Sequence, residues 1–153
     1  MRVFRTTPKS KHQELVRIFP VLKARDTDIS EQWDSVAITV FDHWLSREDA
    51  SRYFDHRTEH EQKLFDSMWA KSYELLALEF MPYRVKYKSV SHVSFREPKS
   101  SELLIKRLEI KNNLSLLTLV FPEQKAIYEQ SYDDTHLLYF QCYESVKPLF
   151  GHH

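Results

Sequence analysis

The chain has 153 residues, of which 42% are hydrophobic, and its 22 basic and 22 acidic residues cancel to a net charge of zero. This composition excludes intrinsic disorder, which requires low hydrophobicity and high net charge, and removes the simplest electrostatic case for a nucleic-acid or anionic-membrane partner. The one glycine, Gly151, lies at the end of the chain. The sequence therefore lacks the glycine-rich phosphate loops, dinucleotide-binding turns and nucleophile elbows by which many enzymes are recognised.

The chain contains one cysteine, Cys142, so an intrachain disulfide cannot form. Residues 1–6 are not followed by the apolar run of a signal peptide, and no apolar run is long enough to span a membrane. These features predict a cytoplasmic protein with no membrane partner. Residues 1–150 are expected to form a single domain, and residues 151–153 are interpreted as the remnant of a purification tag.

The first predicted element is an amphipathic helix over residues 9–24, which Pro20 is expected to divide into two short pieces. A second helix is predicted over residues 33–45, where the β-branched run at 36–40 favours a strand instead. The helix is preferred because seven apolar residues fit the 3.6-residue period over more than three turns. These residues are Trp33, Val36, Ala37, Val40, Phe41, Trp44 and Leu45.

A further helix is predicted over residues 58–81, after a variant of the capping box at residues 46–49 that starts a separate turn. Pro82 ends this helix, since proline cannot continue the helical hydrogen bonds. Its predicted apolar stripe consists of Leu64, Phe65, Met68, Trp69, Leu75, Leu76 and Phe80.

The pattern then changes to period two, and residues 83–96 are predicted to form one long or bent strand with its bend near Ser89 and Ser91. A short helix is expected at residues 100–110, because its composition favours helix over strand. Three short strands, 114–121, 125–130 and 135–143, complete a β-meander. Since no glycine is available, Asn and Asp are expected to supply any turn positions with positive φ.

Helices that precede an antiparallel sheet define an α+β protein. We expect N-terminal helices packed on one face of a C-terminal, mainly antiparallel sheet. If that sheet curls around the helices, the architecture would be similar to the nuclear-transport-factor-like cone, whose open end often holds a small ligand.

The charges are segregated along the chain, with seven basic and one acidic residue at 1–25 and five basic and thirteen acidic residues at 26–80. One face of the predicted strand 83–96 is basic, and this face is the first candidate binding site. It consists of Arg84, Lys86, Lys88, His92 and Arg96. Their spacing of about 6–7 Å would match phosphates along a nucleic acid, but the tyrosines that could stack on bases point to the opposite face.

Three further constellations could carry chemistry. Glu129, Asp133 and Asp134 surround one hairpin and could hold a magnesium ion or act as acid and base. His56, Glu59 and His60 match the H-x-x-E-H pattern of zinc proteases, in which both histidines lie on one helix face. No third ligand is evident for that pair, so neither a metal nor another cofactor is predicted.

Cys142 lies six residues after His136 in one predicted strand, about 20 Å away, so the two cannot form a nucleophile–base pair. Cys142 is expected to be a small core residue. The sequence favours a non-enzymatic bacterial protein that binds another protein or a second copy of itself, of the accessory, immunity or antitoxin kind. The alternative is a small-ligand or enzymatic pocket between helices and sheet, lined by tyrosines and histidines. Nucleic-acid binding through the basic strand is ranked third.

Overall fold

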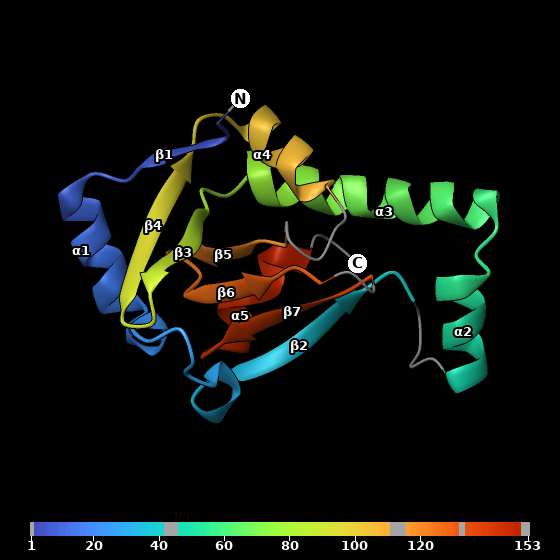
Figure 1. The fold of residues 1–153 in the computed structure, drawn as a ribbon, viewed down its shortest axis with the longest axis horizontal. Coiled ribbons are helices and arrows are strands. Elements are labelled where there is room, and N and C mark those ends of the chain that lie inside the picture. Colours follow the sequence, from blue (N-terminus) through green and yellow to red (C-terminus); the bar gives the residue numbers. More distant parts are fainter. Residues whose placement is uncertain (1, 42–45, 111–115, 132–133, 151–153) are drawn as a thin grey trace.

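The computed structural model describes residues 2–41, 46–110, 116–131 and 134–150, which form an α+β fold around one open antiparallel sheet (Figure 1). The strand order is β1-β4-β3-β5-β6-β7-β2. The strands are β1 (Phe4–Thr6), β2 (Asp34–Thr39), β3 (Tyr83–Ser89), β4 (His92–Pro98), β5 (Thr118–Phe121), β6 (Ala126–Glu129) and β7 (Thr135–Phe140). The predicted α+β class is therefore confirmed, and the sheet is not closed into a barrel.

Helices cover both faces of the sheet. One face packs against α1 (Lys9–Ile18) and the 3-10 helices η1 (Pro20–Leu22) and η2 (Ile29–Glu31), and we call it the α1 face; its strand residues are Tyr83, Val85, Phe95, Val120, Ile127 and Tyr139. The α3 face packs against α3 (Glu59–Leu78), α4 (Ser101–Leu108) and α5 (Tyr143–Val146); its strand residues are Leu119, Phe121, Ala126, Tyr128, Leu138 and Phe140. The remaining helices are α2 (Arg47–Asp55) and η3 (Lys147–Phe150).

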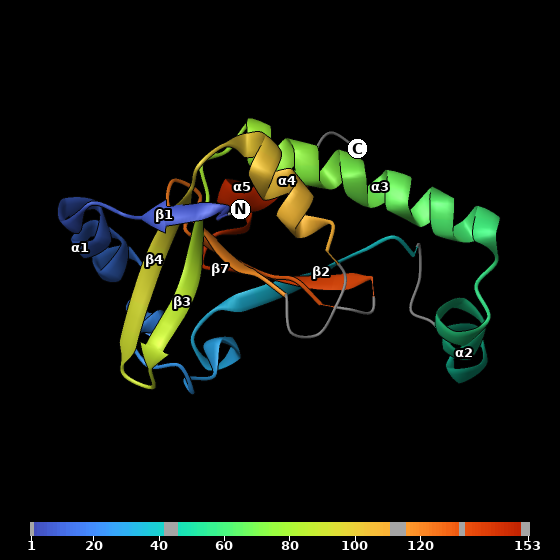
Figure 2. The same ribbon diagram turned by 45° about the horizontal axis from the view of Figure 1, so that its top comes forward.

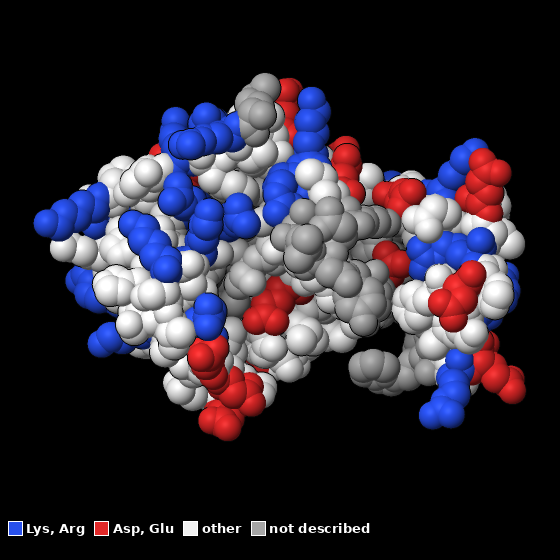
Figure 3. Space-filling model, in the orientation of Figure 1, with Lys and Arg blue, Asp and Glu red and all other residues white. Residues whose placement is uncertain are grey.

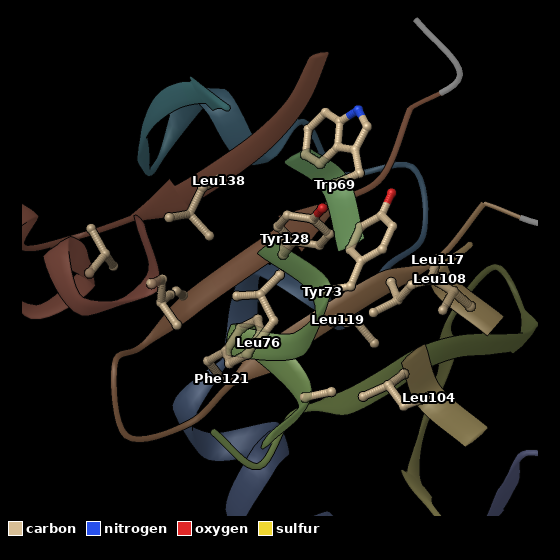
Figure 4. Close-up of a cluster of buried hydrophobic side chains, with 14 of the residues drawn as sticks. Trp69, Tyr73, Leu76, Leu104, Leu108, Leu117, Leu119, Phe121, Tyr128 and Leu138 are labelled. Carbon is tan, nitrogen blue, oxygen red and sulfur yellow. The ribbon is translucent and has the colours of Figure 1, made fainter. Parts of the chain in front are cut away.

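The long helix α3 confirms the helix predicted at 58–81 and supplies much of the larger core (Figure 4). Thr58 caps its start: the Thr58 hydroxyl accepts from the Glu61 amide, and the Glu61 carboxylate accepts from the Thr58 amide. The buried stripe consists of Phe65, Trp69, Tyr73, Leu76 and Ala77. Leu64 and Met68, predicted on this stripe, are 51% and 42% exposed. The buried face of α3 is centred instead on the residues that follow them, Phe65 and Trp69.

The predicted division of the first helix is also confirmed. Helix α1 ends at Ile18, and η1 begins at Pro20, which occupies the first position where a missing amide proton is tolerated. Leu15, Phe19 and Leu22 are buried against the α1 face. Ser46, in turn, caps the start of α2 by accepting from the Asp49 amide.

The helix predicted at residues 33–45 is wrong. Residues 34–39 form β2, which pairs with β7 from Asp34↔Phe140 to Thr39↔Thr135. Val36 and Ile38 pack against the larger core while Ala37 is exposed, so the β-branched run follows period two and the apparent helical stripe is coincidental. Trp44 and Leu45, also assigned to that stripe, lie outside the described residues.

The one long or bent strand predicted at 83–96 is two strands, because the chain reverses between Ser89 and His92, at the predicted bend, and forms the β3–β4 hairpin. The alternation keeps its phase across the turn, so the sequence pattern alone could not show the reversal. The β5–β6–β7 meander and the short helix α4 are confirmed. Among the described residues, two have positive φ: Asp134 (57°), a residue type expected at such turn positions, and Lys125 (51°), which is not.

Cys142 is exposed and occupies the N-cap position of α5, which contradicts its predicted place in the core. Strand β7 ends at Phe140, so the alternation that would bury Cys142 stops before it. Figure 2 shows that α2 and the adjoining end of α3 extend beyond the sheet. None of the helices in the described ranges combines the length and apolar character needed to cross a membrane.

Candidate functional site

The basic residues predicted on one strand lie on the β3–β4 hairpin, on the same side of the sheet as the α3 face. Arg84 of β3 lies directly opposite Arg96 of β4, and Lys86 lies opposite Ser94. Lys88 and His92 lie at the far end of the hairpin, where Ser89 Oγ is 3.1 Å from His92 Nδ1. Two strands therefore contribute to the basic face, and its densest charge is the Arg84–Arg96 pair.

Arg107 of α4 joins this pair, and sequence reasoning missed it. Burial lowers the pKa of Arg84, and the positive charges of Arg107 and Arg96 lower it further. Burial also lowers the pKa of Arg107. Arg107 directly precedes the buried Leu108 and lies three residues after the buried Leu104. Its position beside the apolar stripe of α4 could therefore have indicated that it lies close to the sheet. We call Arg84, Arg96 and Arg107 the arginine cluster.

Two side-chain nitrogens of the arginine cluster lack hydrogen-bond acceptors within the described ranges. Arg96 Nε and Arg107 Nη1 are buried and have no hydrogen-bond partner among the described residues. Glu97, the neighbour of Arg96, points to the other side of the sheet, where its carboxylate accepts from Arg5 Nε at 2.6 Å. Buried donors without acceptors are unfavourable, and three like charges repel one another. An anion with several oxygens would correct both defects.

Other basic side chains surround the arginine cluster. Figure 3 shows Lys and Arg gathered over β4, β3 and α4, with few acidic side chains among them on that part of the surface. The guanidinium carbon of Arg84 lies 5.2 Å from the centre of the Phe4 ring, which orients the group and covers one of its faces. The arrangement suits carboxylates or phosphates, which guanidinium groups bind through paired, parallel hydrogen bonds.

The predicted acidic turn site is not brought together. Asp134 points to the α3 face, where its carboxylate accepts from Trp69 Nε1 at 2.7 Å and from Arg57 Nη2 at 2.6 Å. Glu129 lies on the α1 face, next but one to Ile127 along β6. Asp133 lies outside the described residues. The carboxylate of Asp134 therefore holds the β6–β7 turn against α3.

A buried polar network continues from Asp134. The His136 ring stacks on the indole of Trp69, with ring centres 4.0 Å apart, and its Nδ1 bonds to the Tyr128 hydroxyl. Burial raises the pKa of Tyr128 well above its usual value. Gln130 Nε2 donates to the Leu108 carbonyl at 2.6 Å. These groups satisfy one another inside the core, so the network fixes strand and helix positions.

The H-x-x-E-H residues do not share one helix. His56 is the C-cap of α2, whereas Glu59 and His60 begin α3, and Thr58 caps α3 between them. The two histidines therefore lack the i,i+4 relation on which the zinc hypothesis rests. Within the described ranges, no group of three or more His, Cys, Asp or Glu side chains is placed to hold a metal ion.

A pocket of about 450 Å³ lies between the η1–η2 segment and the α1 face. Its walls include the rings of Tyr87 and Tyr139, the carboxylate-bearing Glu129, and the apolar Val21 and Ile29. A pocket between helices and sheet that is lined by tyrosines resembles the predicted alternative, although none of its lining residues is a histidine. Comparison of the chain with protein-family models, curated proteins and solved structures found no match.

Proposed function

We propose that the protein is a non-enzymatic binding protein whose arginine cluster recognises an acidic segment of a partner protein. The observation that carries the proposal is the pair of buried, unbonded donors, Arg96 Nε and Arg107 Nη1, in a cluster that forms no ion pair with the described residues. Natural proteins leave few buried donors unsatisfied, and such exceptions often mark functional sites. A carboxylate-rich segment would supply the missing acceptors.

Several features favour a protein over a nucleic acid as the partner. Tyr83 and Tyr87 lie on the α1 face, on the other side of the sheet from the arginine cluster, so the bases of a nucleic acid held by that cluster could not stack on them. Ile110, at the end of α4, is 45% exposed and offers an apolar contact near Arg107. Arginine beside apolar groups is typical of the centre of protein interfaces. The single cysteine of the sequence, which is exposed, fits the reducing environment of the cytoplasm.

The test uses a fluorescein-labelled acidic peptide of ten Asp and Glu residues, with binding followed by fluorescence anisotropy at about 0.15 M salt, where diffuse charge effects are screened beyond roughly 8 Å. The decisive variant is Arg84→Lys with Arg96→Lys, which keeps the charge but loses the paired hydrogen bonds. We expect binding to weaken by about tenfold or more, since hydrogen bonds to charged groups contribute about 1.5–3 kcal/mol.

The matched control is Arg17→Lys with Arg25→Lys, two exposed arginines on the side of α1 and η2, which should leave the affinity unchanged. If the Arg84→Lys, Arg96→Lys variant binds the peptide as tightly as the wild type does, the interaction is non-specific charge attraction and the proposal is wrong. Tighter binding of a single-stranded or duplex oligonucleotide than of the peptide would replace the proposal with a nucleic-acid role.

A further inference from the structure

The pocket on the α1 face contains a carboxylate that forms no ion pair with the described residues, and it is independent of the arginine cluster. Glu129 forms no ion pair or side-chain hydrogen bond with the rest of the described chain. Its carboxylate is half-buried, and burial raises its pKa. The side chain therefore has an unfavourable environment that a cation in the pocket would improve.

The other charged groups of the pocket are already engaged. The Asp28 carboxylate caps η2 by accepting from the Ser30 amide at 3.0 Å. Arg25, at the rim, lies 3.5 Å from the carboxylate of its neighbour Asp26. Among the acidic residues that line the pocket, Glu129 is thus the one whose carboxylate forms no hydrogen bond or ion pair within the described chain, while the charge of Asp28 adds to the negative potential near Tyr139.

Two tyrosines stand beside Glu129. Burial raises the pKa of both Tyr87 and Tyr139, and the negative charge of Glu129, which lines the same pocket, raises it further, so all three groups lie close together. The Tyr87 hydroxyl donates to the Leu22 carbonyl at 2.6 Å, which fixes the ring and holds η1 against the sheet. The Arg25 amide donates to the Val90 carbonyl at 2.8 Å and anchors the same segment to the β3–β4 turn. The pocket is therefore built before any ligand arrives.

We infer that this pocket binds a small organic cation, whose ammonium group pairs with Glu129 beside the rings of Tyr87 and Tyr139. Aromatic faces attract cations, and the attraction increases when the site excludes water. The apolar walls, Val21, Leu22, Ile29 and Val85, would cover the carbon skeleton of the ligand. A volume of about 450 Å³ lies within the range of pockets that take small molecules.

The test compares n-butylammonium and choline with n-butanol, a neutral molecule of similar size, by calorimetry and by amide chemical shifts at mildly alkaline pH. At least one of the cations should bind about tenfold or more tightly than butanol and shift the amides of η1, η2 and β6. Glu129→Gln should abolish this preference. Because Glu129 has no partner to lose, this variant should remain folded, and its melting temperature should not fall.

Glu123→Gln, on the exposed β5–β6 turn, is the matched control and should bind as the wild type does. The Arg84→Lys, Arg96→Lys variant should also keep the cation preference, which separates this result from the test of the arginine cluster. Butanol binding as tightly as both cations, undiminished binding by Glu129→Gln, or shifts confined to other elements would each overturn the inference.

Discussion

At the scale of single residues, Asp134 joins parts of the chain that are far apart in sequence. Its backbone has positive φ, its carboxylate accepts from Trp69 and Arg57, and its carbonyl accepts from the Thr39 hydroxyl at 3.0 Å. Trp69 occupies the centre of this arrangement, because it also stacks on His136. One turn, one helix and the edge strand β2 therefore depend on the same few contacts.

Trp69→Ala is expected to lower the free energy of unfolding by about 3–5 kcal/mol, because it empties a buried site and leaves Asp134 without one of its donors. Trp69→Phe should have a smaller effect, since it keeps most of the packing. Met68→Ala, the exposed neighbour, is the control. Urea unfolding followed by circular dichroism measures all three, and an unchanged midpoint for Trp69→Ala would show that this face of α3 contributes little.

The burial of Trp69 could be predicted from the sequence because it depends on local periodicity. Its partner Asp134 could not be, since the two residues are 65 positions apart and nothing local indicates the contact. The basic face was predicted in the same way, from alternation along the chain. Arg107 was missed because its nearness to Arg84 depends on how α4 packs beside the sheet.

The arginine cluster also has a stability cost in the free protein. Arg107→Leu removes a repulsive, partly desolvated charge and is expected to raise stability by about 0.5–2 kcal/mol, as replacements at strained binding sites often do. The same variant should weaken binding of the acidic peptide. Thermal unfolding measures the first effect, and a lower melting temperature than the wild type would indicate that Arg107 is satisfied without a ligand.

At the scale of elements, one carboxylate bridges α2 and α3, beside the bonds that Arg57 forms with the Tyr53 carbonyl and the Gln62 side chain. Glu61 accepts from the Thr58 amide at 2.9 Å and from Arg52 Nη1 at 2.7 Å. These bonds, that of Arg52 foremost, lower the pKa of Glu61 to about 2. A lowered pKa means that the ionised carboxylate stabilises the folded junction. That contribution is complete above the ordinary pKa and is lost as the pH falls through the folded value.

The junction is therefore expected to loosen as the pH falls from about 4.5 to about 2. Amide hydrogen exchange at the start of α3 should accelerate over this range in the wild type. Glu61→Gln should already show the faster exchange at neutral pH and should lose the pH dependence. Glu59→Gln, an exposed position in the same first turn of α3, should keep the pH dependence of the wild type. The same pH profile for Glu61→Gln and the wild type would contradict the assignment.

The elements differ in how far their sequences define them. Helix α3 carries its own cap, stripe and terminating proline, so its prediction succeeded. Strand β2 was mistaken for a helix because its residues form a strand only by pairing with β7, about 100 positions later. Such pairing is a property of the whole fold, and local propensity yields to it.

At the scale of the whole molecule, the basic and acidic groups of the two proposed sites lie on different sides of the sheet. The arginine cluster lies on the side of the α3 face, and the Glu129 pocket opens on the α1 face. The net charge of zero conceals this separation. Local fields, and not the total charge, therefore determine which partners approach which side.

Nucleic acids are expected to bind weakly despite the basic hairpin. A mobility-shift assay at about 0.15 M salt should show no affinity tighter than about 10 μM, because the acidic residues at 26–80 repel phosphates and the tyrosines of β3 are turned away. Submicromolar binding that is abolished by changing Arg84, Lys86 and Lys88 to Glu would contradict this and promote nucleic-acid recognition to the main function.

The turn at Lys125 shows how this chain manages without glycine. A lysine held at a φ of 51° raises the energy of the folded state by about 1–2 kcal/mol relative to an ordinary conformation. Glycine would remove that strain, but it would also widen the range of conformations open to the unfolded chain. With no glycine between residues 1 and 150, the unfolded ensemble is unusually restricted. Folding therefore costs this chain less conformational entropy than it would cost a glycine-rich chain of the same length, and part of its stability comes from that difference.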